Sequence, residues 1–304
     1  MDGSPLGLVD AGQRRLGSLP LVGPLGYGQW RYTAHGVGAA QALVETALDA
    51  GLNLIDTADV YGLDWGGTGF GNCEALLGRV LAAAPQLRER MVLATKGGIA
   101  PPVPYDSSPA ALRAACEASL RRLGVDVIDL YQIHRPDMFA HPGDVAATLA
   151  ALRDEGKIRE VGVSNHTPAK VDALQAHLPF AMVSSQSEFS AAHLTPMRDG
   201  TFDQCMRDGL AVLAWSPLGG GRLATGDGVP SELLTVLDDI AGREAVDRSA
   251  VALAFVLAHP TRPIAIIGTQ RPERITASLG ALRVKLDRAD VYRIVQASHG
   301  APLP

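Results

Sequence analysis

Cysteine is scarce in this sequence, and its scarcity excludes two kinds of protein. The chain has 3 cysteines, Cys73, Cys116 and Cys205, which form no C-x-x-C pair and have no histidine at the spacing of metal ligands. We therefore expect neither a disulfide framework nor a metal site. Free thiols suit a reducing compartment, so we expect the protein in the cytoplasm.

Long hydrophobic runs are absent as well. A membrane-spanning helix needs roughly eighteen or more apolar residues in succession, and no window of this sequence contains them. Residues 1–20 also lack the continuous apolar core of a secretion signal. The sequence thus predicts a protein that does not use the membrane as a partner.

Positive charge is in deficit. The 27 lysines and arginines are outnumbered by 32 aspartates and glutamates, which gives a net charge of -5. This balance argues against nucleic acid or an anionic membrane surface as the main partner. No long tail or additional interaction segment indicates a protein partner, so we expect the partner to be a small molecule.

Eight short apolar runs, in contrast, alternate with longer helical patterns along the whole chain. In one of these helical stretches, Ser108, Pro109 and Gly124 are residue types that begin and end a helix. Strand–helix alternation predicts a parallel sheet, and eight such units in 304 residues predict a single closed (β/α)8 TIM-type barrel over residues 1–304. The apolar runs occupy residues 21–28, 52–57, 90–96, 125–134, 158–165, 181–188, 209–217 and 263–269.

A doubly wound open sheet is the alternative architecture. Such a sheet usually has a G-x-G-x-x-G turn after its first strand, and this sequence has none. Within the barrel reading, residues 225–234 and the segment after Leu286 are expected to add a loop and a C-terminal helix.

Polar residues follow several of the apolar runs, at the end where the active site of such a barrel lies. Asp56 ends the second run and Tyr61 follows it, while Lys96 ends the third run and His134 the fourth. Each has a plain structural alternative, because a lysine can be solvated, an aspartate can begin a helix and a histidine can be part of the core. Closure of the barrel would nevertheless bring all four to one mouth, which favours a shared site.

These four side chains suit the chemistry of a proton donor. A phenol with an ordinary pKa near 10 is a weak acid, and the charge of Lys96 is expected to lower the pKa of Tyr61. Asp56 would keep Lys96 charged, and His134 would donate a hydrogen bond to a bound carbonyl oxygen. Tyr61 would then act as a general acid. No activated serine or cysteine nucleophile accompanies the set, so acyl transfer is not expected.

The sequence also resembles the aldo-keto reductases, from about residue 20 to residue 286. WSPLGGGRL, together with HRPD at 134–137, most resembles a bacterial branch of oxidoreductases in that family. Six motifs in order make the resemblance specific. They are DTADVYG (56–62), ATK (94–96), DLYQIH (129–134), GVSN (162–165), WSPLGGGRL (215–223) and IIGTQRPERI (266–275).

This resemblance implies a catalytic tetrad of Asp56, Tyr61, Lys96 and His134, and the reduction of an aldehyde or ketone by NADPH. By motif position, Ser164, Asn165 and Gln186 would hold the nicotinamide carboxamide. Trp215 would stack on the nicotinamide ring, and the 216–222 loop would line the pyrophosphate. The residues implied in cofactor binding are Gly28, Gln29, Trp30, Ser164, Asn165, Gln186, Trp215, Ser216, Pro217, Leu218, Gly220, Arg222, Gly268, Thr269, Gln270, Arg271 and Arg274.

The adenosine end departs from the pattern of many relatives. They carry a Lys-Ser pair for the 2′-phosphate and a Glu-Asn pair for the adenine, whereas this chain has Gly268–Thr269 and Ala277–Ser278. Arg274 matches the family arginine and Arg271 lies nearby, and guanidinium groups suit phosphate. NADPH is thus expected in preference to NADH, with a weaker preference than usual.

Three aromatic residues are expected to form the substrate pocket. Trp30 and Tyr32 follow the first strand, and Trp65 lies in the glycine-rich loop 62–72. Two other functions stay open from the sequence alone. One is an NADP(H)-binding sensor or auxiliary protein with slow turnover, and the other is an aldolase that uses Lys96 to form a Schiff base.

Overall fold

The computed structural model describes residues 7–33, 36–64 and 66–303. In this part of the chain, eight parallel strands form a closed barrel in the order β1 to β8, and β1 pairs with β8 to complete it. Each predicted apolar run overlaps one strand, with only β3 extending one residue past its run, so the predicted TIM-type barrel is confirmed. The strands are β1 (Leu25–Gly28), β2 (Leu54–Asp56), β3 (Val92–Gly97), β4 (Ile128–Ile133), β5 (Ile158–Ser164), β6 (Ser184–Glu188), β7 (Ala211–Trp215) and β8 (Ile264–Ile267).

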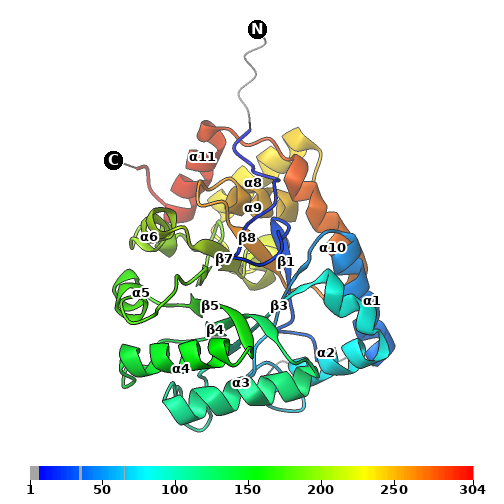
Figure 1. Cartoon of the computed structure of the whole chain (residues 1–304). Coiled ribbons are helices and arrows are strands. Elements are labelled where there is room, and N and C mark those ends of the chain that lie inside the picture. Colours follow the sequence, from blue (N-terminus) through cyan, green and yellow to red (C-terminus); the bar gives the residue numbers. More distant parts are fainter. Residues whose placement is uncertain (1–6, 34–35, 65, 304) are drawn as a thin grey trace.

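Helices surround the barrel wall on its outer side (Figure 1). They are α1 (Val37–Asp49), α2 (Asn72–Ala83), α3 (Pro109–Leu123), α4 (Pro142–Asp154), α5 (Pro168–Gln175), α6 (Thr201–Asp208), α7 (Arg222–Thr225), α8 (Ser231–Glu244), α9 (Arg248–Leu257), α10 (Pro272–Ala277) and α11 (Arg288–His299). Short 3-10 helices lie at η1 (Pro85–Arg90), η2 (Thr195–Met197), η3 (Gly219–Gly221) and η4 (Ser278–Arg283). None of the helices in the described ranges has the length and apolar character that a membrane span requires.

The ends of α3 illustrate how local sequence sets these elements. The Ser108 hydroxyl accepts a hydrogen bond from the backbone of Ala111, and Pro109 occupies the first turn. Gly124 ends the helix in the left-handed conformation, with a φ of 65°. Glycine adopts this conformation without the strain that a side chain would add, which explains why the helix stops there.

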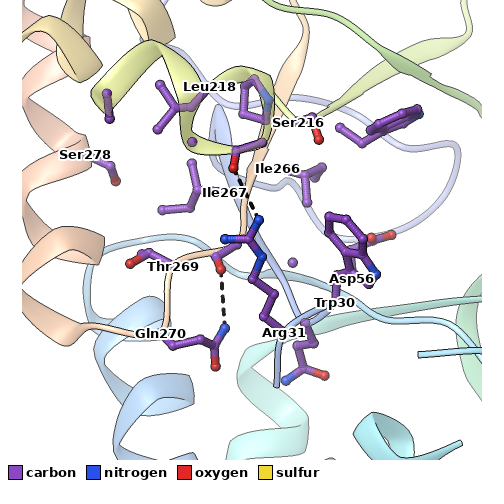
Figure 2. Close-up of a pocket in the computed structure, with 18 of the residues that line it drawn as sticks. Trp30, Arg31, Asp56, Ser216, Leu218, Ile266, Ile267, Thr269, Gln270 and Ser278 are labelled. Carbon is purple, nitrogen blue, oxygen red and sulfur yellow. Dashed lines mark hydrogen bonds between the residues drawn. The ribbon is translucent and has the colours of Figure 1, made fainter. Parts of the chain in front are cut away.

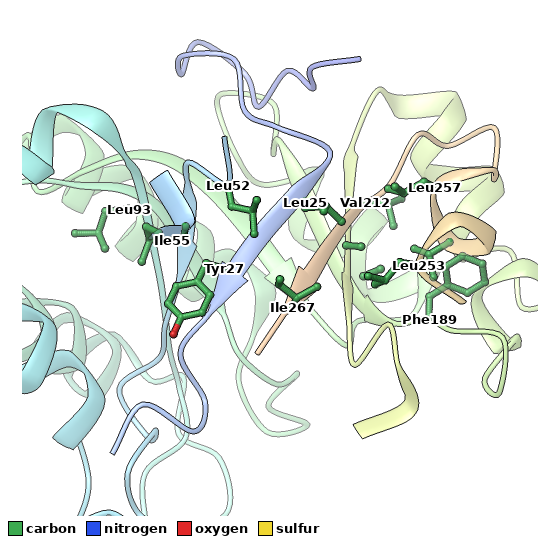
Figure 3. Close-up of a cluster of buried hydrophobic side chains, with 14 of the residues drawn as sticks. Leu25, Tyr27, Leu52, Ile55, Leu93, Phe189, Val212, Leu253, Leu257 and Ile267 are labelled. Carbon is green, nitrogen blue, oxygen red and sulfur yellow. The ribbon is translucent and has the colours of Figure 1, made fainter. Parts of the chain in front are cut away.

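Alternate residues of the strands face opposite sides of the barrel wall, as the pleat requires. Leu54 and Leu213 belong to the cluster inside the barrel. Their neighbours Ile55 and Val212 belong to the larger cluster between strands and helices, part of which Figure 3 shows. Because the alternation continues to the strand ends, the residue two positions after Leu54 points into the barrel mouth, and that residue is Asp56.

The other end of the barrel is closed by the segment that precedes β1. Leu16, Leu19 and Val22 from this segment pack in the inner cluster. The backbone N–H and the hydroxyl of Ser18 both donate to the buried Glu160 carboxylate, at 2.8 and 2.7 Å. This end is therefore filled, and access to the barrel is from the strand C-termini.

Candidate active site

The carboxyl ends of the strands surround one large cavity of about 1160 Å³. Asp56, Tyr61 and His134 line it in one region, and Arg274 and Ser278 line it in another. Figure 2 shows how side chains from the loops after β1, β7 and β8 converge on this space. A cavity of this size and charge can hold an elongated anionic ligand together with a second small molecule.

The predicted tetrad meets at the mouth. The Lys96 ammonium donates to Asp56 Oδ2 at 2.7 Å, to the Thr57 carbonyl at 2.8 Å and to the Tyr61 hydroxyl at 3.3 Å. The rings of Tyr61 and His134 meet edge to face, with centroids 5.8 Å apart. Lys96 is fully buried and lies behind the cavity wall, whereas the other three line the cavity. Lys96 therefore contacts Tyr61 and does not face the cavity.

Two glutamines hold the second oxygen of Asp56. The amide nitrogen of Gln186 donates to Asp56 Oδ1 at 2.9 Å, and that of Gln132 reaches the same oxygen at 3.5 Å. Gln186 was expected to hold a nicotinamide carboxamide, and this bond leaves its amide oxygen for that purpose. Gln132 was not predicted. It lies inside DLYQIH, two residues before His134, and the strand alternation that leads to His134 would have indicated it.

The pKa of Tyr61 does not move in the expected direction. Burial raises the pKa of the phenol above its ordinary value of 10, and this outweighs the Lys96 ammonium, which lowers it. The prediction of a lowered pKa is thus wrong for the protein without ligands, because the enclosure of the phenol was not visible in sequence. Tyr61 consequently carries its proton at neutral pH.

Lys96 and His134 are held in opposite charge states. Burial alone would lower the pKa of Lys96, but Asp56 and Tyr61 raise it above 10.5. For His134, burial lowers the pKa well below 6.5, and the charges of Lys96 and Arg135 act in the same direction. His134 is thus a neutral imidazole that can donate one hydrogen bond, and its Nδ1 atom has no hydrogen-bond partner among the described residues.

A second network fixes the part of the cavity beside His134. Trp215 Nε1 donates to the Asn165 side-chain oxygen at 3.0 Å, and the Asn165 amide nitrogen donates to Ser164 Oγ at 2.7 Å. Asn165 and Ser216 have positive φ angles of 59° and 50°. Such backbone conformations are uncommon outside glycine and gather at functional sites. They turn the chain sharply at the ends of β5 and β7, so that the Trp215 ring is presented to the cavity.

All of the residues implied in cofactor binding, from Gly28 to Arg274, line this one cavity. The guanidinium groups of Arg222, Arg271 and Arg274 are among them and provide local positive charge on a chain of net charge -5. A flat aromatic ring in one region and cations in another fit a dinucleotide cofactor.

One of the residues expected in the substrate pocket lies elsewhere. Tyr32 is fully buried and does not line the cavity, because its hydroxyl donates to the Ala40 carbonyl at 2.7 Å and draws the ring under α1. The prediction for Tyr32 is therefore wrong. Trp30 does line the cavity and is 39% exposed, and Trp65 lies outside the described residues.

Three arginines that line the cavity, Arg31, Arg135 and Arg248, are not among the predicted residues. Arg31 Nη2 donates to the Gly220 carbonyl at 3.2 Å, and this side chain crosses from the loop after β1 to the loop after β7 (Figure 2). The Arg135 guanidinium lies 5.9 Å from the centroid of the Trp215 ring. Arg31 and Arg135 directly follow Trp30 and His134, so their position next to strand-end residues is the sequence signal for both.

Comparisons with known proteins agree with this geometry. The sequence model of the aldo/keto reductase family matches residues 24–299. The chain is 48% identical over 286 residues to a 6-dehydroglucose reductase of Novosphingobium aromaticivorans, covering 93% of this chain and 94% of that protein. It is 34% identical over 290 residues to a 6-dehydroglucose reductase of Agrobacterium fabrum, covering 90% and 93%. The structure of a glycerol dehydrogenase from Gluconobacter oxydans matches with a TM-score of 0.82 and 26% identity, covering 96% of this chain and 97% of that one.

Proposed function

The chain belongs to the aldo/keto reductase family, and we propose that it reduces the aldehyde group of a hydroxylated substrate to the alcohol with NADPH. The observation that carries this proposal is the Lys96 ammonium, which bonds to both Asp56 and Tyr61 beside the neutral His134. In support of the proposal, a phenol and a neutral imidazole lie at the wall of a cavity large enough for cofactor and substrate.

The residues act on the carbonyl oxygen. Tyr61 donates its proton to that oxygen as negative charge develops there, and Lys96 stabilises the phenolate that remains. Asp56 keeps Lys96 charged, and His134 donates a hydrogen bond that orients the carbonyl. When bound, NADPH supplies the hydride that adds to the carbonyl carbon.

Several residues would hold the cofactor. The Trp215 ring offers a flat surface for the nicotinamide, and Arg222 and Arg31 flank the glycine-rich η3 segment, where a diphosphate would meet positive charge. Arg271 and Arg274 would meet the 2′-phosphate, which favours NADPH over NADH. The Ser278 hydroxyl donates to the Ile275 carbonyl at 2.6 Å, so its proton is already engaged and it offers the adenine only an acceptor.

The substrate class follows from two relatives and from the mouth of the cavity. Both relatives are named 6-dehydroglucose reductase, and 6-dehydroglucose is glucose with an aldehyde at its sixth carbon. Arg135, which follows His134, and Asp64, which lies three residues after Tyr61, line the cavity and offer donors and acceptors for hydroxyl groups. We therefore favour a sugar aldehyde over an apolar one.

The test is the loss of NADPH absorbance with 6-dehydroglucose and with an aromatic aldehyde. We expect the wild type to turn over the sugar aldehyde with the higher kcat/KM, and Tyr61→Phe to lose roughly 100-fold or more of kcat. NADPH affinity should stay unchanged in this variant, and Tyr292→Phe, on the exposed face of α11, is the matched control. A wild type that binds NADPH but reduces no carbonyl would instead favour the sensor function.

The aldolase alternative is not favoured by the geometry. A Schiff base requires an accessible, uncharged amine. Lys96 is fully buried, donates three hydrogen bonds and has its pKa raised by Asp56 and Tyr61. Such a lysine suits the stabilisation of a phenolate rather than attack on a substrate.

A further inference from the structure

A second, smaller cavity of about 200 Å³ lies beside the active site, between the loops after β4 and β5 and the first turns of α4 and α5. These two helices are neighbours in the barrel's outer ring (Figure 1). Most of the lining is apolar, from Ile133, Pro136, Met138, Ala140, Pro142, Val145, Ala173 and Leu174. The polar lining is Ser107, Asp137, His166 and Lys170.

One polar group in this cavity is buried without a partner. Ser107 is 1% exposed, and its hydroxyl has no hydrogen-bond partner among the described residues. A buried hydroxyl in this state costs free energy that a bound ligand could recover. The backbone N–H of Ser107 donates to Asp137 Oδ2 at 2.9 Å, which fixes the serine at the edge of the cavity.

The lining contains one cation, Lys170, and one carboxylate, Asp137, and the carboxylate is already engaged by backbone N–H groups. Lys170 supplies an ammonium, and no described residue forms an ion pair or a side-chain hydrogen bond with it. Both Asp137 oxygens already accept backbone N–H groups, from Ser107 and Phe139, at 2.9 Å. The first turns of α4 and α5 also present the positive ends of their helix dipoles.

His166 contributes neither a charge nor a free donor, because the one N–H of its neutral ring donates to the Ser164 carbonyl. Its Nδ1 atom lies 3.0 Å from the Ser164 carbonyl oxygen, and burial lowers its pKa to about 4. At neutral pH, Lys170 is therefore the cation of this cavity, and Ser107 and His166 are uncharged.

We propose that this cavity is a second ligand site, which takes a small monocarboxylate with an apolar body, such as benzoate. The apolar walls would enclose the body, and Lys170 and Ser107 would bind the carboxylate. An apolar cavity of about 150 Å³ suffices for benzene in another protein, so the size is adequate. Met138 lines the cavity and is 73% exposed, so it lies where the cavity meets solvent.

A ligand in this site would contact the ends of β4 and β5, which carry the active-site residues His134 and Asn165. Ile133 lines the cavity and precedes His134, and His166 lines it and follows Asn165. The two active-site residues are themselves linked, because the Asn165 amide nitrogen donates to the His134 carbonyl at 3.3 Å. Binding here is thus placed to influence the reduction.

The test measures benzoate binding to the wild type by ligand-observed NMR and compares two variants. We expect Lys170→Met to weaken binding about 10-fold, the loss for a hydrogen bond to a charged group. Arg135→Met, which removes the guanidinium nearest to Trp215 in the active-site cavity, should leave benzoate affinity unchanged. Leu174→Trp, which fills the cavity, should abolish binding, while the unfolding temperature shows that the variant is folded.

Three outcomes would overturn the proposal. Benzoate that fails to bind the wild type shows that the cavity has no such ligand. Loss of binding in Arg135→Met with full binding in Lys170→Met places the carboxylate in the active site. Unchanged binding in both Lys170→Met and a folded Leu174→Trp places it elsewhere. None of these results depends on the identity of the aldehyde or on the proposed reduction.

Discussion

At the scale of single residues, Tyr61 and Asp59 of DTADVYG are two residues apart but lie in different surroundings. Tyr61 opens on the large cavity and hydrogen-bonds to Lys96. Asp59 is fully buried, and neither of its carboxylate oxygens has a hydrogen-bond partner in the described ranges. The first therefore bears on the reaction and the second on stability.

The raised pKa of Tyr61 predicts the pH dependence of the reaction. Because burial keeps the phenol protonated beyond its ordinary pKa of 10, reduction should show no loss from this group between about pH 6 and about pH 9. The reverse oxidation needs the phenolate and should rise with pH over the same interval. The measurement is kcat/KM in both directions across this range, with Tyr61→Phe as control. A reductase profile that falls through an apparent pKa near 7 would contradict the assignment.

Asp59 predicts a stability that falls as the pH rises. Burial raises its pKa well above 3.8, and the neighbouring Glu74 carboxylate adds to this effect, while Arg122 and Lys96 oppose it. The folded state thus holds a proton that the unfolded state releases above its ordinary pKa. The resulting loss of stability begins near pH 4 and grows until the pH passes the folded-state pKa.

Substitution of Asp59 by asparagine removes this dependence. We expect Asp59→Asn to raise the free energy of unfolding at pH 8 by roughly 1 kcal/mol or more, with little difference at pH 4. Urea unfolding at both pH values measures it. Asp203→Asn on α6 is the control, because the Asp203 side chain forms no ion pair or hydrogen bond with the described residues. Equal effects of Asp59→Asn at the two pH values would show that Asp59 is charged in the folded protein.

At the scale of elements, strands β3 and β4 carry Lys96 and His134 and must keep their register for the tetrad to form. Lys96 is paired with Gln132 across the two strands. Next to Lys96, a Cβ placed on Gly97 would overlap the Tyr131 hydroxyl and approach Tyr131 Cζ to 3.1 Å. The close approach of the two strands at this point thus depends on glycine.

Gly97→Ala should therefore destabilise the protein by about 1–3 kcal/mol, as overpacking in a core does. Tyr131→Phe alone should cost little, because the Tyr131 hydroxyl is buried with no hydrogen-bond partner among the described residues. The double variant should recover much of the loss, and a double-mutant cycle of unfolding free energies measures the coupling. Additive effects of the two substitutions would mean that the hydroxyl is not the obstacle.

Most elements could be predicted from sequence because their signals are local. The apolar runs overlap the eight strands, and Ser108 and Gly124 mark the ends of α3. Tyr32 could not be placed, because its burial depends on a hydrogen bond to Ala40 after the chain turns into α1. Short runs also give strand ends only approximately, as the four-residue β1 within 21–28 illustrates.

At the scale of the whole molecule, stability and chemistry lie at opposite ends of the barrel. The segment around Ser18 fills one end, where Glu160 accepts two hydrogen bonds from it. The tetrad lies at the other end. In barrels of this kind the end at the strand N-termini contributes to stability rather than to catalysis.

Glu160→Ala should lower stability without lowering activity. It leaves two donors of Ser18 without their acceptor, and we expect a loss of about 1–3 kcal/mol in the free energy of unfolding. The kcat/KM of the folded variant should stay within a factor of about two of the wild type, since the site is remote. Glu160→Gln, which keeps an acceptor oxygen, should lose less stability. A large fall in kcat/KM without a change in stability would contradict this separation.

The site could be predicted where barrel closure alone gathers its residues. Asp56, Lys96 and His134 end successive strands, so their meeting follows from the topology. The charge states could not be predicted, because the raised pKa of Tyr61 depends on enclosure by segments distant in sequence. For the same reason the sequence did not indicate the bond between Arg31 and Gly220, which joins residues 189 positions apart.

The arrangement of the mouth has an evolutionary consequence. The proposed proton transfer belongs to residues on and just after β2 to β4, whereas the proposed cofactor contacts come mainly from the ends of β5 to β8. The parts of the segments after β2 and β4 that lie beyond Tyr61 and His134 can then diverge among descendants without disturbing either the proposed acid or the proposed reductant. We therefore expect changes in these peripheral segments to alter which substrate is bound while the reaction stays the same. In a family built this way, substrate preference should change more readily than reaction type.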